Sequence, residues 1–125
     1  MAEITVLVVD EDPELLELTE TFLERGSDDI TVETETDTGT VIDRVRDGAI
    51  DCVVSDFRMP GMDGIELFEE LRTHRPELPF FLFTAADRDV EAAAAEAGIT
   101  GYVQKGSGTD HYDELTQQIL AAVDG

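Results

Sequence analysis

Five short apolar runs divide the 125-residue sequence, and a segment with helical periodicity follows each of them. The runs are rich in β-branched and aromatic residues and cover residues 4–9, 30–32, 52–55, 80–83 and 102–104. Strands that alternate with helices form parallel sheets, because each crossover helix returns the chain to the same edge. The runs are nearly continuous rather than alternating, which is typical of strands buried on both faces. The sequence therefore predicts a doubly wound α/β fold, with residues 1–125 as a single domain.

Capping and turn residues mark the ends of the expected helices. Asp12 and Pro13 form an N-cap followed by a first-turn proline, and Gly26 ends that helix. Further helices are expected around 41–45, from 65 to just before Pro76, over 90–97 and over 112–123. The stretch 57–64 holds one proline and two glycines and has neither period, so we expect a loop there.

The charge of the chain is strongly one-sided. Thirty acidic residues against eight basic ones give a formal net charge of −22. A surface of this sign repels nucleic acid and anionic membranes, so neither is an expected partner. The acids are spread over every segment, which we interpret as an acidic, halophilic adaptation to salt that screens self-repulsion.

Location and redox state follow from what the sequence lacks. No apolar run approaches the roughly 20 residues of a membrane helix, and the N-terminus has no signal-peptide pattern. Cys52 is the sole cysteine and stands in an apolar run, where it is expected to be a buried core residue. We therefore expect a cytoplasmic protein.

Polar residues end four of the five apolar runs, and their chemistry is complementary. Asp10 and Glu11 follow the first run, Asp56 the third, Thr84 the fourth and Lys105 the fifth. The carboxyl ends of parallel strands meet at one edge of the sheet, where ligands of such folds bind. Lys105 is the only lysine of the chain, whereas the other seven basic residues are arginine. We therefore expect these side chains to form one site.

The expected site suits phosphoryl transfer. Crowded carboxylates require a counter-charge, and Mg²⁺ prefers oxygen ligands. An ammonium group and a hydroxyl group provide donors for phosphoryl oxygens. A carboxylate can act as the nucleophile, and Asp56, on the central strand, is the best placed acceptor.

Three stretches, 6–13, 55–67 and 98–105, resemble the signature segments of response-regulator receiver domains of two-component signalling. The most specific piece is DFRMPGMDG at 56–64. The similarity covers essentially the whole chain. It implies a flavodoxin-like strand order, 2-1-3-4-5, for the five-stranded parallel sheet with its five helices.

The resemblance also implies a role for each site residue. Asp56 would accept a phosphoryl group from a sensor histidine kinase or a phosphotransfer protein. Asp10, Glu11 and Asp56, with the backbone carbonyl of Arg58, would hold Mg²⁺. Lys105 and Thr84 would contact the phosphoryl group. Thr84 and Tyr102 would act as switch residues for the face made by helix four, strand five and helix five, which signals to a downstream effector protein or domain. Such a protein is an acceptor with at most slow autodephosphorylation, not a turnover enzyme.

Two positions depart from the family pattern. Glu11 stands where the family more often has aspartate, which bears on metal geometry and affinity. Gly106 follows Lys105 where the family commonly has proline, so the loop and Lys105 are less restrained.

Two other functions remain alternatives. One is a pseudo-receiver that is not phosphorylated and acts as a protein-interaction module, which the complete set of Asp56, Thr84 and Lys105 disfavours. The other, with less support, is a haloacid-dehalogenase-type phosphatase, suggested by Asp10 and Asp12 after an apolar run. The chain is either a stand-alone receiver or a piece of a longer protein, and phosphorylation-dependent dimerisation is a further alternative.

Overall fold

The structure, a computed structural model, describes residues 3–85, 88–106 and 110–124. The elements alternate along the chain as β1 (Ile4–Val9), α1 (Pro13–Gly26), β2 (Ile30–Glu35), α2 (Thr38–Arg46), β3 (Cys52–Ser55), α3 (Gly64–His74), β4 (Phe80–Ala85), α4 (Arg88–Ala97), β5 (Gly101–Lys105) and α5 (Asp110–Asp124). All neighbouring strands pair in parallel, in the order β2-β1-β3-β4-β5. The predicted doubly wound fold and its strand order are therefore confirmed.

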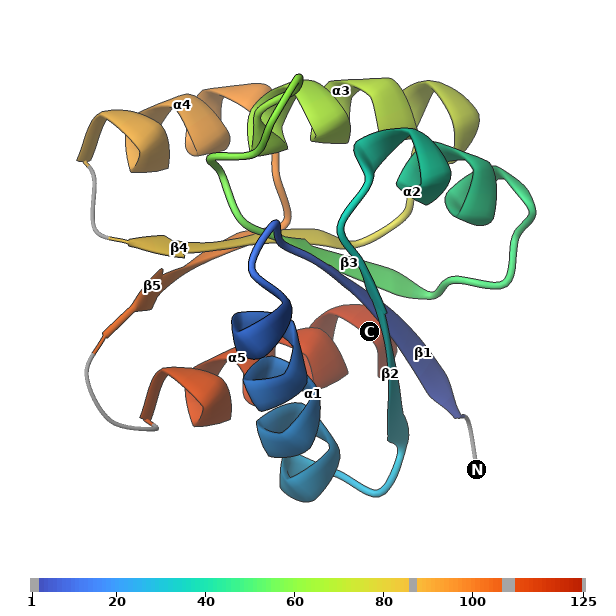
Figure 1. Cartoon of the computed structure of the whole chain (residues 1–125), viewed down its shortest axis with the longest axis vertical. Coiled ribbons are helices and arrows are strands. Elements are labelled where there is room, and N and C mark those ends of the chain that lie inside the picture. Colours follow the sequence, from blue (N-terminus) through green and yellow to red (C-terminus); the bar gives the residue numbers. More distant parts are fainter. Residues whose placement is uncertain (1–2, 86–87, 107–109, 125) are drawn as a thin grey trace.

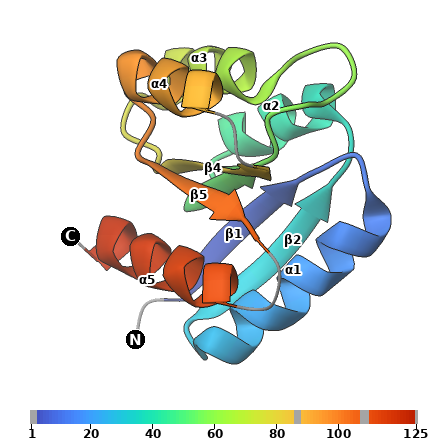
Figure 2. The ribbon, with the colours of Figure 1, turned by 90° about the vertical axis from the view of Figure 1, so that its left-hand side faces the viewer.

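The helices cover the two faces of the sheet unequally. Figure 1 shows α2, α3 and α4 on one face and α1 and α5 on the other, and Figure 2 shows the same three layers from the side. Successive strand residues point to opposite faces, so β1 sends Val6 and Val8 toward α1 and α5, and Leu7 and Val9 toward α2 and α3. The sheet is consequently buried on both faces, as the continuous apolar runs predicted.

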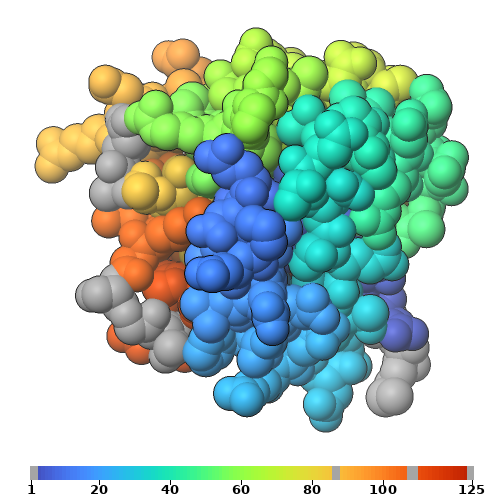
Figure 3. Space-filling view, in the orientation of Figure 1, coloured from blue at the N-terminus to red at the C-terminus, as the bar shows by residue number. Residues whose placement is uncertain are grey.

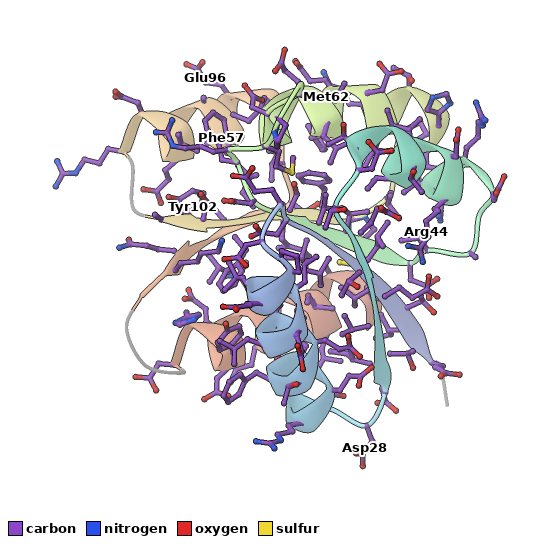
Figure 4. The ribbon with its side chains drawn as sticks, viewed as in Figure 1. Asp28, Arg44, Phe57, Met62, Glu96 and Tyr102 are labelled. Atoms are coloured by element: carbon purple, nitrogen blue, oxygen red, sulfur yellow. The ribbon has the colours of Figure 1, made fainter. Side chains whose placement is uncertain are left out.

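The edge strand β2 is longer than the sequence predicts. It continues beyond the expected 30–32 to Glu35, and its whole length pairs with β1. Its last three residues are polar and half-buried, so they carry no apolar signal. Arg44 of α2, labelled in Figure 4, forms ion pairs with Glu33 and Glu35 and donates a hydrogen bond to the Thr34 carbonyl (3.3 Å). Backbone pairing and this arginine stabilise the extension.

Helix starts also differ from the expected ones by one to three residues. Asp37 and Asp63 are N-caps, so α2 begins at Thr38 and α3 begins at Gly64, which the sequence assigned to the preceding loop. In α3 the cap is reciprocal, because Glu66 accepts a hydrogen bond from the Asp63 backbone N–H while Asp63 accepts one from Glu66. None of the helices within the described ranges is long and apolar enough to cross a lipid bilayer.

Cys52 lies fully buried in β3, as predicted. Burial raises the pKa of its thiol, and the neighbouring Asp51 carboxylate adds to the rise. Because only the thiolate reacts, we expect Ellman's reagent to modify the native protein at least about 100-fold more slowly than the urea-unfolded chain. Equal rates in the two states, measured by release of the coloured thiolate, would contradict the burial of this thiol.

Candidate functional site

The ends of β1 and β3 lie side by side at the carboxyl edge of the sheet. Val9 pairs with Ser55, and the Asp56 N–H donates a hydrogen bond to the Val9 carbonyl (3.0 Å). Asp10 and Asp56 are thus the first residues beyond two adjacent central strands. In Figure 3 the segment after β1 (blue) lies against the loop after β3 (green) at the surface. The predicted meeting of these two carboxylates is a direct result of the strand register.

Lys105 lies between the two carboxylates. Its Nζ is 3.0 Å from Oδ2 of Asp10 and 3.7 Å from Oδ1 of Asp56. The pleat explains this meeting. The residues two positions before these three (Val8, Val54 and Val103) pack in the core that α1 and α5 cover, so the side chains of Asp10, Asp56 and Lys105 start on that side. Asp10 is only 5% exposed, and a carboxylate so buried requires a partner of opposite charge. Lys105 supplies that charge.

Each carboxylate also accepts a backbone hydrogen bond. Oδ1 of Asp10 accepts from the Asp12 N–H (3.0 Å), and Oδ1 of Asp56 accepts from the Phe57 N–H (2.8 Å). These bonds fix the two side chains toward the same edge. No residue in the described part of the chain donates a hydrogen bond to Oδ2 of Asp56.

A small pocket opens beside Asp56. Its volume is about 180 Å³, which suits a small anion rather than a nucleotide. It is lined by residues from the loop after β3, from β4, α4 and β5: Asp56, Phe57, Arg58, Thr84, Ala85, Val90 and Lys105. Thr84 is 6% exposed at the end of β4. The pocket therefore brings together the three residues predicted to handle a phosphoryl group.

The predicted metal ligands are only partly assembled. Glu11 is exposed and does not join Asp10 and Asp56, and no three Asp, Glu, His or Cys side chains of residues 3–85, 88–106 and 110–124 form a group that could hold a metal ion. Asp10, Asp56 and the carbonyl of Arg58 provide hard oxygen atoms, which are the ligand type that Mg²⁺ prefers. The donor chemistry fits Mg²⁺, and the one positive charge of Lys105 is shared between the two carboxylates.

Tyr102 lies on the opposite face of the sheet from Lys105. Figure 4 shows it, like Phe57, on the side that α3 and α4 cover. Its ring is half-buried, and its hydroxyl donates a hydrogen bond to the Ala85 carbonyl (3.4 Å). Tyr102 thus contacts the residue that follows Thr84, without lining the pocket beside Asp56.

Sequence analysis missed two contributors to this site. The backbone N–H of Phe57 holds Asp56, and the ring of Phe83 lies 5.5 Å from Nζ of Lys105. A backbone donor leaves no mark in a sequence. Phe83 has the pattern of a core residue, and nothing in the sequence indicates that its ring faces a cation.

Comparison with known proteins identifies the chain. The family model described as response regulator receiver domain matches residues 6–119. The chain belongs to this family. Receiver domains are phosphoacceptors of two-component signalling rather than classical turnover enzymes, which implies a histidine kinase and an effector as partners.

Individual relatives agree with the family assignment. The receiver domain is 37% identical over 95 residues to the chemotaxis protein CheY of Pseudomonas aeruginosa, covering 73% of this chain and 77% of CheY. It is 34% identical over 102 residues to the transcriptional regulatory protein GlrR of Escherichia coli, covering 80% of this chain but only 22% of GlrR. A crystal structure of a LuxR-family two-component response regulator from Aurantimonas superimposes with a TM-score of 0.85 at 31% identity, covering 99% of this chain and 87% of that one.

Proposed function

We propose that Asp56 accepts a phosphoryl group from the phosphohistidine of a sensor kinase or phosphotransfer protein in a Mg²⁺-dependent reaction. An Asp56 oxygen forms a bond to phosphorus while the bond from phosphorus to the donor's imidazole nitrogen breaks. The observation that carries the proposal is the pocket in which Asp56, just beyond β3, meets Thr84 of β4 and Lys105 of β5. Its polar groups match a small anion at the end of a parallel sheet.

Each residue of the pocket has one task. The Thr84 hydroxyl donates a hydrogen bond to a phosphoryl oxygen. The Lys105 ammonium leaves Asp10 and donates a hydrogen bond to another phosphoryl oxygen. Asp10, Asp56 and the Arg58 carbonyl would hold Mg²⁺, and Glu11, which now lies exposed and apart from them, would join them only by turning inward. The ion would supply positive charge against the phosphoryl oxygens. Because the single Lys105 ammonium now lies close to both carboxylates, binding of the cation and release of Lys105 from Asp10 are expected to be linked.

The signal would leave through the α4, β5 and α5 face. Thr84 is followed by Ala85, whose carbonyl accepts the hydrogen bond from Tyr102. A shift of Thr84 toward a phosphoryl group moves this carbonyl and thereby changes the position of the half-buried Tyr102 ring. The receiving partner is an effector protein or an attached effector domain, in a cytoplasmic pathway without direct contact to nucleic acid. Phosphorylation could also transmit the signal by making two copies of the domain dimerise through the same face.

The direct test uses acetyl phosphate as a small phosphoryl donor. With Mg²⁺, the intact mass of the wild-type protein is expected to rise by one phosphoryl group, and with EDTA it is expected to stay unchanged. Absence of the rise with Mg²⁺ would contradict the proposal and favour a protein-interaction module without phosphorylation.

Lys105→Met is expected to strengthen Mg²⁺ binding while it slows phosphorylation. Removing a positive charge beside two carboxylates raises their affinity for a cation by about tenfold in a partly exposed site. The same change removes a donor to the phosphoryl oxygens. Calorimetric titration with Mg²⁺ measures the first effect. The control, Arg25→Met, removes an exposed charge at the last turn of α1 and is expected to leave Mg²⁺ affinity unchanged.

We also propose that the acidic surface adapts the domain to high salt. A net charge of −22 on 125 residues produces self-repulsion that salt screens. The free energy of unfolding, measured with urea, is therefore expected to rise by at least about 1 kcal/mol between 0.05 M and 2 M KCl. A stability independent of KCl would contradict the adaptation without affecting the role of Asp56.

A further inference from the structure

Lys105 has few covalent restraints on its position. It is the last residue of β5, and the residue after it is Gly106. Glycine is the most flexible residue, so it does not restrain the backbone next to Lys105. A lysine side chain also loses about 2 kcal/mol of rotamer entropy when it is fixed. Contacts with other side chains, rather than the backbone, must therefore hold the ammonium at the pocket.

The ring of Phe83 lies where it can hold this ammonium. Nζ of Lys105 lies 5.5 Å from the ring centroid, within the range of a cation–π contact. The register explains the approach. Ala85 pairs with Lys105 and Phe83 pairs with Val103, so Phe83 is the diagonal neighbour of Lys105 on the same face of the sheet.

The ring itself is fixed from the helix side. Phe83 is only 3% exposed, and its ring contacts those of His111 (5.4 Å between centroids) and Tyr112 (5.6 Å) at the start of α5. Tyr112 in turn stacks on Phe22 of α1, with centroids 4.8 Å apart. Aromatic contacts of this kind leave the Phe83 ring little freedom to turn away from Lys105.

We propose that Phe83 is a positioning residue that holds the Lys105 ammonium at the phosphoryl pocket. The inference rests on the proposed role of Lys105 in phosphoryl transfer. A ring face attracts a cation without carrying a charge of its own, so the contact persists while Lys105 exchanges Asp10 for a phosphoryl oxygen. A carboxylate in the same place would compete with the phosphoryl group.

The alternative is that Phe83 only fills the core, and matched variants separate the two roles. Phe83→Leu removes the ring, and Phe83→Tyr keeps it. Phe81→Leu makes the same deletion two residues earlier on β4, in the same core cluster and fully buried. Phe81 pairs with Gly101 and does not lie beside Lys105. Loss of its ring is therefore expected to affect Lys105 only through changes in core packing.

The sole lysine provides a readout that packing alone does not move. Labelling the chain with ε-¹³C lysine gives one signal, whose relaxation reports the order of the Lys105 side chain in the unphosphorylated protein. Phe83→Leu is expected to lower this order and to slow phosphorylation by acetyl phosphate about fivefold, the factor that corresponds to a cation–π contact of about 1 kcal/mol. Phe83→Tyr and Phe81→Leu are expected to keep both quantities near wild type.

Equal effects of Phe83→Leu and Phe81→Leu on Lys105 order would overturn the inference, and so would an unchanged order in Phe83→Leu. If wild type takes no phosphoryl group, the proposed function fails. The relaxation data still decide whether Phe83 positions Lys105, because they need no phosphorylation.

Discussion

Asp56→Asn abolishes the phosphoryl incorporation that acetyl phosphate and Mg²⁺ produce in the wild-type protein: this is the largest effect we expect from a single substitution. An amide oxygen is a far weaker nucleophile than a carboxylate, so the rate is expected to fall by at least about 10³-fold. The side-chain oxygen can still accept the hydrogen bond from the Phe57 N–H, so the fold is retained. Intact-mass spectrometry after incubation with the donor measures the result.

Asp28→Asn is the matched control for this substitution. Asp28 is exposed in the turn between α1 and β2, away from the carboxyl edge of the sheet, and Figure 4 labels it. The chemical change and the change in net charge are identical, so this variant is expected to take up the phosphoryl group as wild type does. Persistent incorporation in Asp56→Asn would mean that another residue is the acceptor.

Gly64→Ala is expected to destabilise the domain by about 2–4 kcal/mol, because it introduces a methyl group where there is no space. A Cβ at this first residue of α3 would lie 2.6 Å from the Asp56 carbonyl oxygen and 2.6 Å from Cδ2 of Leu82. The carbonyl belongs to backbone and cannot turn aside as a flexible side chain can. The Gly64 N–H also donates a hydrogen bond to the Phe57 carbonyl (2.8 Å), so the strain reaches the loop beside Asp56. Urea unfolding measures the loss.

Gly39→Ala is the control for Gly64→Ala. A Cβ at Gly39, in the first turn of α2, would meet only Asp37, at an ordinary contact distance of 3.5 Å. Alanine also favours helix over glycine by up to about 1 kcal/mol, so this variant is expected to be as stable as wild type or more stable. A Gly64→Ala protein with wild-type stability would contradict the close packing of α3 on the end of β3.

The fold could be predicted from sequence because its main signals are local. Apolar runs, the Asp12–Pro13 helix start and the glycines at the helix ends gave the element order, and the glycines Gly48 and Gly98 do follow α2 and α4 with positive φ. The extension of β2 to Glu35 could not be predicted in this way. Its stability comes from pairing with β1 and from Arg44 of the next helix, and neither contact has a local pattern.

The site also has residues that the sequence predicts and residues that it does not. Asp10, Asp56 and Lys105 could be predicted to meet because parallel strands bring their carboxyl ends to one edge. The side chain of Glu11 could not be placed from sequence. Adjacency to Asp10 suggested a shared site, but the residue lies exposed where the chain turns into α1. The contact of Lys105 with Phe83 depends on a diagonal register and a side-chain conformation, which a single sequence does not specify.

The central claim, that Asp56 carries the phosphoryl group, is tested most directly by locating that group. Borohydride reduces an aspartyl phosphate to homoserine and leaves a free carboxylate unchanged, so peptide mass spectrometry of the treated protein identifies the acceptor. The account predicts that homoserine replaces Asp56 and that every other aspartate stays unchanged. Homoserine at Asp10 or any other position, or a phosphoryl group that survives on a hydroxyl residue such as Ser55, would contradict it.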